Sequence, residues 1–261
     1  MKEKSQNGFF FFCILFLLAF NSFRFRPYLH PMKIGVVVFP GSNCDEDMIH
    51  ILRDVLRMNV IKLWHKEHDL QGCDFIILPG GFSFGDYLRS GAIARFSPIM
   101  QEVINFASNG GFVFGVCNGF QILCEAGLLP GALLHNVHHQ FVCKNTFIRA
   151  VNNDSMLTSG IDQALVLKIP IAHGEGNFIA DESTIQSMND NGQILFRYCD
   201  EDGNVTAASN PNGAMDNIAG ICNVSKNVFG MMPHPERAAE GILGNTDGKI
   251  IFESLFGLVN S

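Results

Sequence analysis

The sequence has no cluster of lysine and arginine residues along its 261 positions. Its 18 basic and 25 acidic side chains leave a formal charge of −7, so it lacks the basic surface that binds nucleic acid. Apolar runs of membrane-spanning length are missing as well: the run at residues 9–20 is twelve residues long, whereas a bilayer span needs about 20. We therefore expect proteins and small molecules as partners, rather than nucleic acid or a membrane.

Cysteine spacing typical of a zinc site or a disulfide framework is also absent. The eight cysteines occupy positions 13, 44, 73, 117, 124, 143, 199 and 222, without a C-x-x-C pair or a Cys/His ligand pattern. This usage indicates reduced thiols and favours a cytoplasmic protein.

Residues 1–31 differ in composition from the rest of the chain. Basic residues flank the apolar run at 9–20, as in a signal peptide or membrane anchor. Met32, however, opens directly into an apolar strand, so a mature protein could start there. Three interpretations stay open: an upstream start codon wrongly assigned as translated, a membrane-directing segment, or another kind of extension. We expect residues 32–261 to form one domain.

Short β-branched runs alternate with helical stretches after Met32, which predicts a parallel sheet covered on both faces. Strands are expected at 34–39, 60–64, 74–78 and 112–116, with helices from residue 45, over 98–107 and over 118–126. Beyond Gly131 the pattern predicts strands at 141–151, 164–170, 194–198, 218–223 and 228–232, and a last helix over about 247–258. The expected class is α/β: a mostly parallel, flavodoxin-like three-layer fold with a smaller antiparallel segment.

The pentapeptide Gly-Val-Cys-Asn-Gly at 115–119 lies between an expected strand and an expected helix. Small residues two positions on either side of Cys117 permit a tight strand-to-helix turn, in which larger side chains would collide. Such a turn aims backbone N–H groups and the helix N-terminus at the sulfur, which stabilises a thiolate and an oxyanion. We interpret Cys117 as a nucleophile, against the alternative of a buried cysteine beside a flexible turn.

A cysteine nucleophile needs a base, an orienting group and oxyanion donors. His234, between two prolines at the end of an expected strand, is the candidate base, and Glu236 is placed to hold its ring. The Gly80-Gly81 pair can supply one oxyanion donor from its backbone, because glycine permits close approach, and the N–H of Asn118 is the candidate for the second.

These motifs, in this order, resemble those of the class I (triad) glutamine amidotransferases, and the resemblance covers residues 32–261. They are Pro-Gly-Gly at 79–81, Gly-x-Cys-x-Gly-x-Gln at 115–121 and His-Pro-Glu at 234–236. Further stretches are similar to the PurQ-type glutaminase subunits of phosphoribosylformylglycinamidine synthase. These stretches are 39–45, 79–89 with 91–94, 115–123, 171–177 and 232–237.

The resemblance implies a thioester mechanism, with Cys117 as nucleophile, His234 as general base and then acid, and Glu236 as its partner. It implies the following residues near bound glutamine: Gly80, Gln121, Asn136, His138 and Phe141. It also implies two partners: a large PurL-type synthetase subunit that receives the ammonia, and a small bridging PurS-type subunit. This chain has no Walker-type phosphate loop, so ATP and Mg²⁺ are expected on the synthetase, with no cofactor here.

Charged and histidine-rich stretches leave other interpretations open. We expect Asp86 and Arg89 to be exposed loop charges on the docking face for the synthetase. His135, His138 and His139 lack partnering ligands at metal spacing, so no metal site is expected, and His173 with Glu175 is expected on a substrate-side or interface loop. Two other functions stay open: an amidotransferase serving another synthetase, and a non-catalytic glutamine-binding regulatory subunit.

Overall fold

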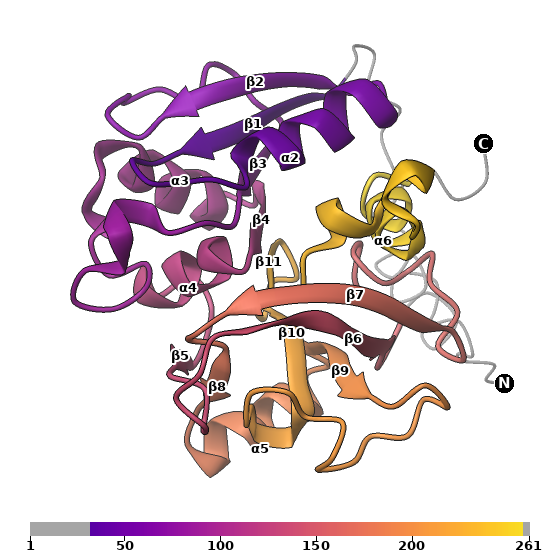
Figure 1. The fold of residues 1–261 in the computed structure, drawn as a ribbon. Coiled ribbons are helices and arrows are strands. Elements are labelled where there is room, and N and C mark those ends of the chain that lie inside the picture. The colour runs from indigo at the N-terminus through magenta and orange to yellow at the C-terminus, as the bar shows by residue number, and fades with distance from the viewer. Residues whose placement is uncertain (1–31, 258–261) are drawn as a thin grey trace, which may run out of the picture. The chain divides into compact units, whose positions relative to one another are not determined.

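The computed structural model describes residues 32–257, and its contacts separate residues 1–31 from residues 32–261 (Figure 1). The expectation for residues 1–31 lies outside the described part. The strands are β1 Lys33–Val38, β2 Asn59–Trp64, β3 Phe75–Leu78, β4 Phe112–Val116, β5 Ala132–Leu134, β6 Val142–Ala150, β7 Val166–His173, β8 Asn177–Ile179, β9 Ile194–Cys199, β10 Ile218–Cys222 and β11 Val228–Met231. The α-helices are α2 Asp45–His50, α3 Pro98–Ser108, α4 Asn118–Glu125, α5 Glu182–Asp190 and α6 Asp247–Leu255.

A nine-stranded sheet forms the centre of the domain, in the order β2-β1-β3-β4-β11-β10-β9-β6-β7. The strands from β2 to β11 in this order are parallel, and the strands from β10 to β7 continue the sheet with antiparallel pairing. Strands β5 and β8 form a separate antiparallel pair. The predicted α/β class is confirmed, and β11 is the strand that joins the two halves of the main sheet.

Helices cover both sides of the parallel strands. Helices α3 and α4 contact the short helix Ala94–Phe96, whereas α2 and α6 contact the short helix Pro235–Ala238. Figure 1 shows the first pair to the left of β4 and the second pair to the right. Strand β3 is buried along its whole length, as expected for a strand covered on both faces. No helix in residues 32–257 is long and apolar enough to cross a membrane.

Most elements predicted from the apolar pattern are present. The predicted helix after Asn43 continues beyond α2 as a π-helical turn at Ile51–Val55, and the predicted end of the last helix, Leu258, lies outside the described residues. The sequence analysis missed β5, β8 and α5. Helix α5 buries only Met188, so it has almost no apolar stripe; its signal was the cap residue Asp181, which accepts a hydrogen bond from the N–H of Thr184 at 2.8 Å.

Two glycines bring α4 into backbone contact with the sheet. A methyl group on Gly119 would lie 1.9 Å from the carbonyl oxygen of Leu78, and one on Gly115 would lie 2.6 Å from the carbonyl of Gly119. Both distances are far below van der Waals contact. The expectation that the turn around Cys117 needs small residues is therefore confirmed, because the helix and the strands touch at these two positions.

Gly119→Ala should destabilise the protein strongly, because the added methyl forces α4 away from β3. We expect a loss of about 3 kcal/mol in the free energy of unfolding, measured by urea denaturation. Gly241→Ala is the matched control, because no atom lies within 4 Å of the added methyl there. Equal stability of the two variants would contradict this account of the contact.

Candidate functional site

Cys117 occupies the turn between β4 and α4 in a strained backbone conformation. Its φ is 50° and its ψ is −105°, an uncommon combination for a residue with a side chain. Its N–H donates to the carbonyl of Met231 at 2.8 Å, and its sulfur lies 3.8 Å from the carbonyl oxygen of Ala172. Only 5% of the residue is exposed. The thiol is therefore fixed at the N-terminus of α4 and shielded from bulk water.

His234 and Glu236 form a buried pair, 2% and 1% exposed. Nδ1 of His234 lies 2.5 Å from Oε1 of Glu236, and the N–H of His234 donates to the carbonyl of Pro170 at 2.8 Å. The sequence analysis expected an extended path here, but residues 235–238 form a short 3₁₀ helix that turns the carboxylate back to the ring. Nε2 of His234 has no hydrogen-bond partner among the described residues and is free for another group.

The charges around His234 favour its protonated form. Burial lowers the pKa of the imidazole, but the carboxylate of Glu236 and the thiolate of Cys117 raise it, and the balance raises the pKa from 6.5 to about 10. An imidazolium between two anions is the arrangement that stabilises a reactive thiolate. The site therefore favours a protonated imidazole next to the sulfur of Cys117.

Gly80, Gly81 and Asn118 lie around the thiol. A methyl group on Gly80 would lie 2.7 Å from ring carbon Cε1 of His234 and 3.4 Å from Cβ of Cys117, so this glycine contacts both. Gly81 has a φ of 130° and lies against Asn43, where a side chain would collide. The N–H groups of Gly81 and Asn118 have no backbone acceptor among the described residues. Gly80 thus lies at the nucleophile and the base, and the assignment of Gly81 and Asn118 as oxyanion donors stays a prediction.

Cys44 lies beside this pair and was missed by the sequence analysis, although the stretch 39–45 contains it. Ligand atoms of Cys44, His234 and Glu236 lie within 4.8 Å of one another, the only such group of potential metal ligands in residues 32–257. The guanidinium of Arg237, however, lies 3.0 Å from the sulfur of Cys44 and also pairs with Asp47 at 3.2 Å. Burial and the charge of Glu236 raise the pKa of the Cys44 thiol to about 12. The guanidinium of Arg237 lies against the Cys44 sulfur, and its positive charge would repel a metal ion at these three atoms.

Asn136 was expected beside the substrate, but the structure buries it completely. Its amide nitrogen donates to the carbonyls of Gln140 and His173, and its oxygen accepts from the N–H of Gly176 at 3.0 Å. His173 lies at the end of β7 rather than on a loop, and burial with the nearby charge of His234 lowers its pKa to about 3. Asn136 and neutral His173 therefore clamp the neighbouring segments together.

The other expected substrate residues differ in their placement. Gln121 is buried next to the nucleophile: its oxygen accepts from the amide of Asn118 at 3.0 Å, and its nitrogen donates to the carbonyl of Glu175 at 2.6 Å. The ring of His138 is hydrogen-bonded to the carbonyl of Pro211 and makes no bond to the triad. Phe141 is exposed and stacks on Phe82, with ring centroids 6.2 Å apart. Gln121 thus lies beside Asn118, and Phe141 lies beside Phe82, the residue that follows Gly81.

Asp86 and Arg89 do not share one environment. Arg89 is exposed as expected and makes a two-point ion pair with Glu125. Asp86 is only partly exposed, and its Oδ1 lies 3.4 Å from the side-chain nitrogen of Asn118. The expectation of an exposed charge is therefore wrong for Asp86, because its carboxylate lies against the side chain of Asn118.

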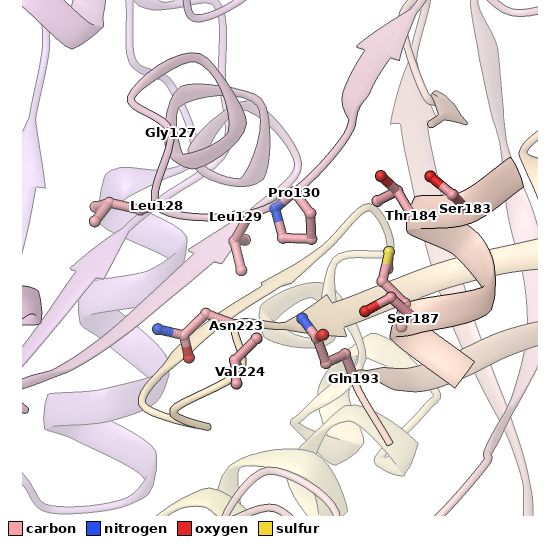
Figure 2. Close-up of a pocket in the computed structure, with 11 residues that line it drawn as sticks. Gly127, Leu128, Leu129, Pro130, Ser183, Thr184, Ser187, Gln193, Asn223 and Val224 are labelled. Carbon is pink, nitrogen blue, oxygen red and sulfur yellow. The ribbon is translucent and has the colours of Figure 1, made fainter. Parts of the chain in front are cut away.

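Two open cavities lie away from the thiol. One, of about 470 Å³, is lined by residues 127–130 after α4, by α5 and by the turn between β10 and β11 (Figure 2). It has no titratable residue in its lining. The other, of about 500 Å³, is lined by residues that include Glu236 and Arg237. The seven cysteines of the described residues are all free thiols, as predicted, and Cys13 lies outside that range.

Comparisons with known proteins identify the family of the chain. The model of the CobB/CobQ-like glutamine amidotransferase domain matches residues 31–249. Phosphoribosylformylglycinamidine synthase subunit PurQ of Chlorobaculum parvum is 56% identical over 86% of this chain and 89% of its own length. The PurQ subunit of Moorella thermoacetica is 58% identical over 86% of this chain and 95% of its own length.

Solved structures of glutamine amidotransferases have the same fold as this chain. A chain from the structure of PurLQS from Thermotoga maritima has 39% identity and a TM-score of 0.76, and the match covers 88% of this chain and all of that chain. A glutamine amidotransferase from the same organism, 13% identical with a TM-score of 0.57, shares the fold over 89% of this chain and all of its own. The chain belongs to the glutamine amidotransferase family and, within it, to the PurQ group.

Proposed function

We propose that this chain is the glutaminase subunit of a phosphoribosylformylglycinamidine synthase, with residues 32–261 as its amidotransferase domain. The observation that carries the proposal is the contact of Gly80 with both Cys117 and His234, whose ring is paired with Glu236, in a chain more than half identical to PurQ subunits. The reaction is hydrolysis of glutamine to glutamate and ammonia.

The first half of the reaction forms a thioester on Cys117. The thiolate attacks the side-chain amide carbon of glutamine, and the carbonyl oxygen becomes an oxyanion that accepts from the N–H groups of Gly81 and Asn118. Protonated His234 then donates its Nε2 proton to the departing nitrogen, so ammonia leaves as the tetrahedral intermediate collapses. Glu236 keeps the ring oriented through Nδ1 during this transfer.

The second half releases glutamate. Neutral His234 takes a proton from water, the resulting hydroxide attacks the thioester carbon, and the same N–H groups stabilise the second oxyanion. The carbon–sulfur bond breaks, and the thiolate and imidazolium form again. His234 therefore acts as an acid in the first half and as a base in the second.

The ammonia is used on another protein. The Thermotoga maritima neighbour was solved as PurLQS. By analogy we assign to this chain a large PurL-type partner and a small PurS-type bridging partner. The large subunit would hold ATP and Mg²⁺ and convert formylglycinamide ribonucleotide to formylglycinamidine ribonucleotide, a step of purine biosynthesis. We also assign the enzyme to the cytoplasm, where reducing conditions keep thiols such as Cys117 unpaired.

Two alternatives are less well supported. A non-catalytic glutamine-binding subunit would not need the buried His234–Glu236 pair, since burying two ionisable groups is costly without a role for them. An amidotransferase serving a different synthetase would not account for identity above 50% to PurQ subunits over most of the chain.

Cys117→Ala should abolish glutamine-dependent synthesis by the reconstituted complex while synthesis from added ammonia continues. Removing the nucleophile should lower glutamine hydrolysis about a thousandfold or more. Cys124→Ala, which removes a thiol from the same helix, is the control and should keep the parent rate. Glutamine-dependent activity retained by Cys117→Ala would refute the mechanism.

Glu236→Gln should shift the pH profile of kcat/KM for glutamine hydrolysis. The carboxylate raises the pKa of His234, so its neutral replacement lowers that pKa, and the imidazolium is lost at lower pH. The basic limb of the profile should move toward neutral pH by about one unit or more. Glu240→Gln, a nearby change outside the pair, should leave the limb in place. An unmoved limb in Glu236→Gln would show that another group controls it.

Arg89→Glu should weaken the coupling to the synthetase. The side chain is 55% exposed beside the loop that carries Asp86, so reversing its charge disturbs a docking face there. We expect glutamine-dependent synthesis to fall about fivefold, roughly 1 kcal/mol, with ammonia-dependent synthesis unchanged. Arg53→Glu, equally exposed on the π-helical turn, is the control. Unchanged coupling in Arg89→Glu would place the docking face elsewhere.

A further inference from the structure

Asp86 is a carboxylate at the substrate site that none of the steps above uses. Its Oδ1 lies 3.4 Å from the side-chain nitrogen of Asn118, the residue that follows the nucleophile. The same nitrogen lies 3.0 Å from Oε1 of Gln121. Two oxygen acceptors, one charged and one neutral, therefore lie on either side of one amide at the first turn of α4.

No basic side chain among residues 32–257 makes an ion pair with Asp86. Arg89, the nearest arginine in sequence, is directed to Glu125, and the groups that act on Asp86 are Ser90 and Glu175. Burial raises the pKa of Asp86 to about 6, a hydrogen bond from Ser90 opposes the rise, and the charge of Glu175 adds to it. The carboxylate is still mostly ionised at neutral pH. The site thus has uncompensated negative charge, which a cationic group would relieve.

The loop that carries Asp86 is built against the site at a conformational cost. Phe84, Asp86 and Leu88 all have positive φ, at 54°, 53° and 73°. Left-handed backbone at residues with side chains is unfavourable and persists where the surroundings enforce it, often at ligand sites. A second polar group of the same site also lacks a partner, since Nε2 of His234 is buried and unpaired among the described residues.

Glutamine has one cationic group, the α-ammonium, and its nitrogen is four bonds from the amide carbon that Cys117 attacks, a reach of about 5 Å. The geometry points to Asp86 as the residue that binds the α-ammonium group of glutamine, with Oε1 of Gln121 as a second acceptor. The charge of Asp86 excludes the α-carboxylate from the same place. This inference rests on the proposed glutaminase function and names the residue that would select an amino acid over a simple amide.

Glu175 has a secondary role in this arrangement. Its carboxylate accepts from the N–H of Ser90 at 3.0 Å and pairs with exposed His135 at 3.4 Å. Its backbone carbonyl accepts from Gln121. The side chain is therefore already engaged and positions Gln121 and the loop, whereas the carboxylate of Asp86 is available to the substrate.

The test compares glutamine with glutaramate, the same molecule without the α-amino group, by ammonia release from the complex. Asp86→Asn keeps the size of the side chain and an acceptor for Asn118 but removes the charge. We expect kcat/KM for glutamine to fall about 10- to 100-fold and kcat/KM for glutaramate to stay at the parent value. Asp202→Asn, which removes the same charge from an exposed turn, should leave both values unchanged.

Asp86→Glu keeps the charge and should retain part of the preference for glutamine over glutaramate. It is the control for a loss of activity that comes only from misfolding of the neutral variant. Equal losses for both substrates in Asp86→Asn, or no loss for either, would overturn the assignment. A preference in Asp86→Glu as low as in Asp86→Asn would also overturn it. Failure of the glutaminase function itself is recognised separately, because Cys117→Ala would then retain ammonia release.

Discussion

The backbone contact between α4 and β3 is the constraint on which the site depends. Without side chains at 115 and 119, the helix begins directly at the end of β4, and Cys117 must take a left-handed conformation to connect them. That conformation presents the sulfur to the first N–H groups of the helix and to His234. The strain at Cys117 is tolerated because the N–H of this residue is also bonded to β11, so the turn is fixed from two sides.

Electrostatics then divides the site into two parts of opposite character. Around the sulfur, His234 has a raised pKa because two anions face it, and Arg237 with neutral Cys44 lies behind Glu236. On the other side of the site, beside Asn118, the carboxylate of Asp86 and Oε1 of Gln121 supply oxygen acceptors. An amino acid with a neutral amide at one end and an ammonium group at the other fits this division.

The sequence predicts the parts of this site that depend on local pattern. Apolar periodicity located the strands, glycine spacing located the turn, and the His-Pro-Glu motif located the base and its partner. Burial and pairing across the sheet could not be predicted in the same way. Asp86 looked like an exposed loop charge but is partly buried beside Asn118, and Cys44 approaches Glu236 through packing of α2 against residues 235–238. Nothing in the sequence indicates that the side-chain amide of Asn136 is hydrogen-bonded to the backbone of neighbouring segments.

The position of β11 has a consequence for how the protein is made. This strand lies in the middle of the sheet, between β4 and β10, although it is the last strand in the chain. It anchors Cys117 through Met231 and leads directly into His234 and Glu236. Until these final residues have been synthesised, the parallel and antiparallel halves have no strand to join them, and the thiol has neither its anchor nor its base. A chain that ends before β11 therefore lacks both the strand that anchors Cys117 and the residues that supply its base.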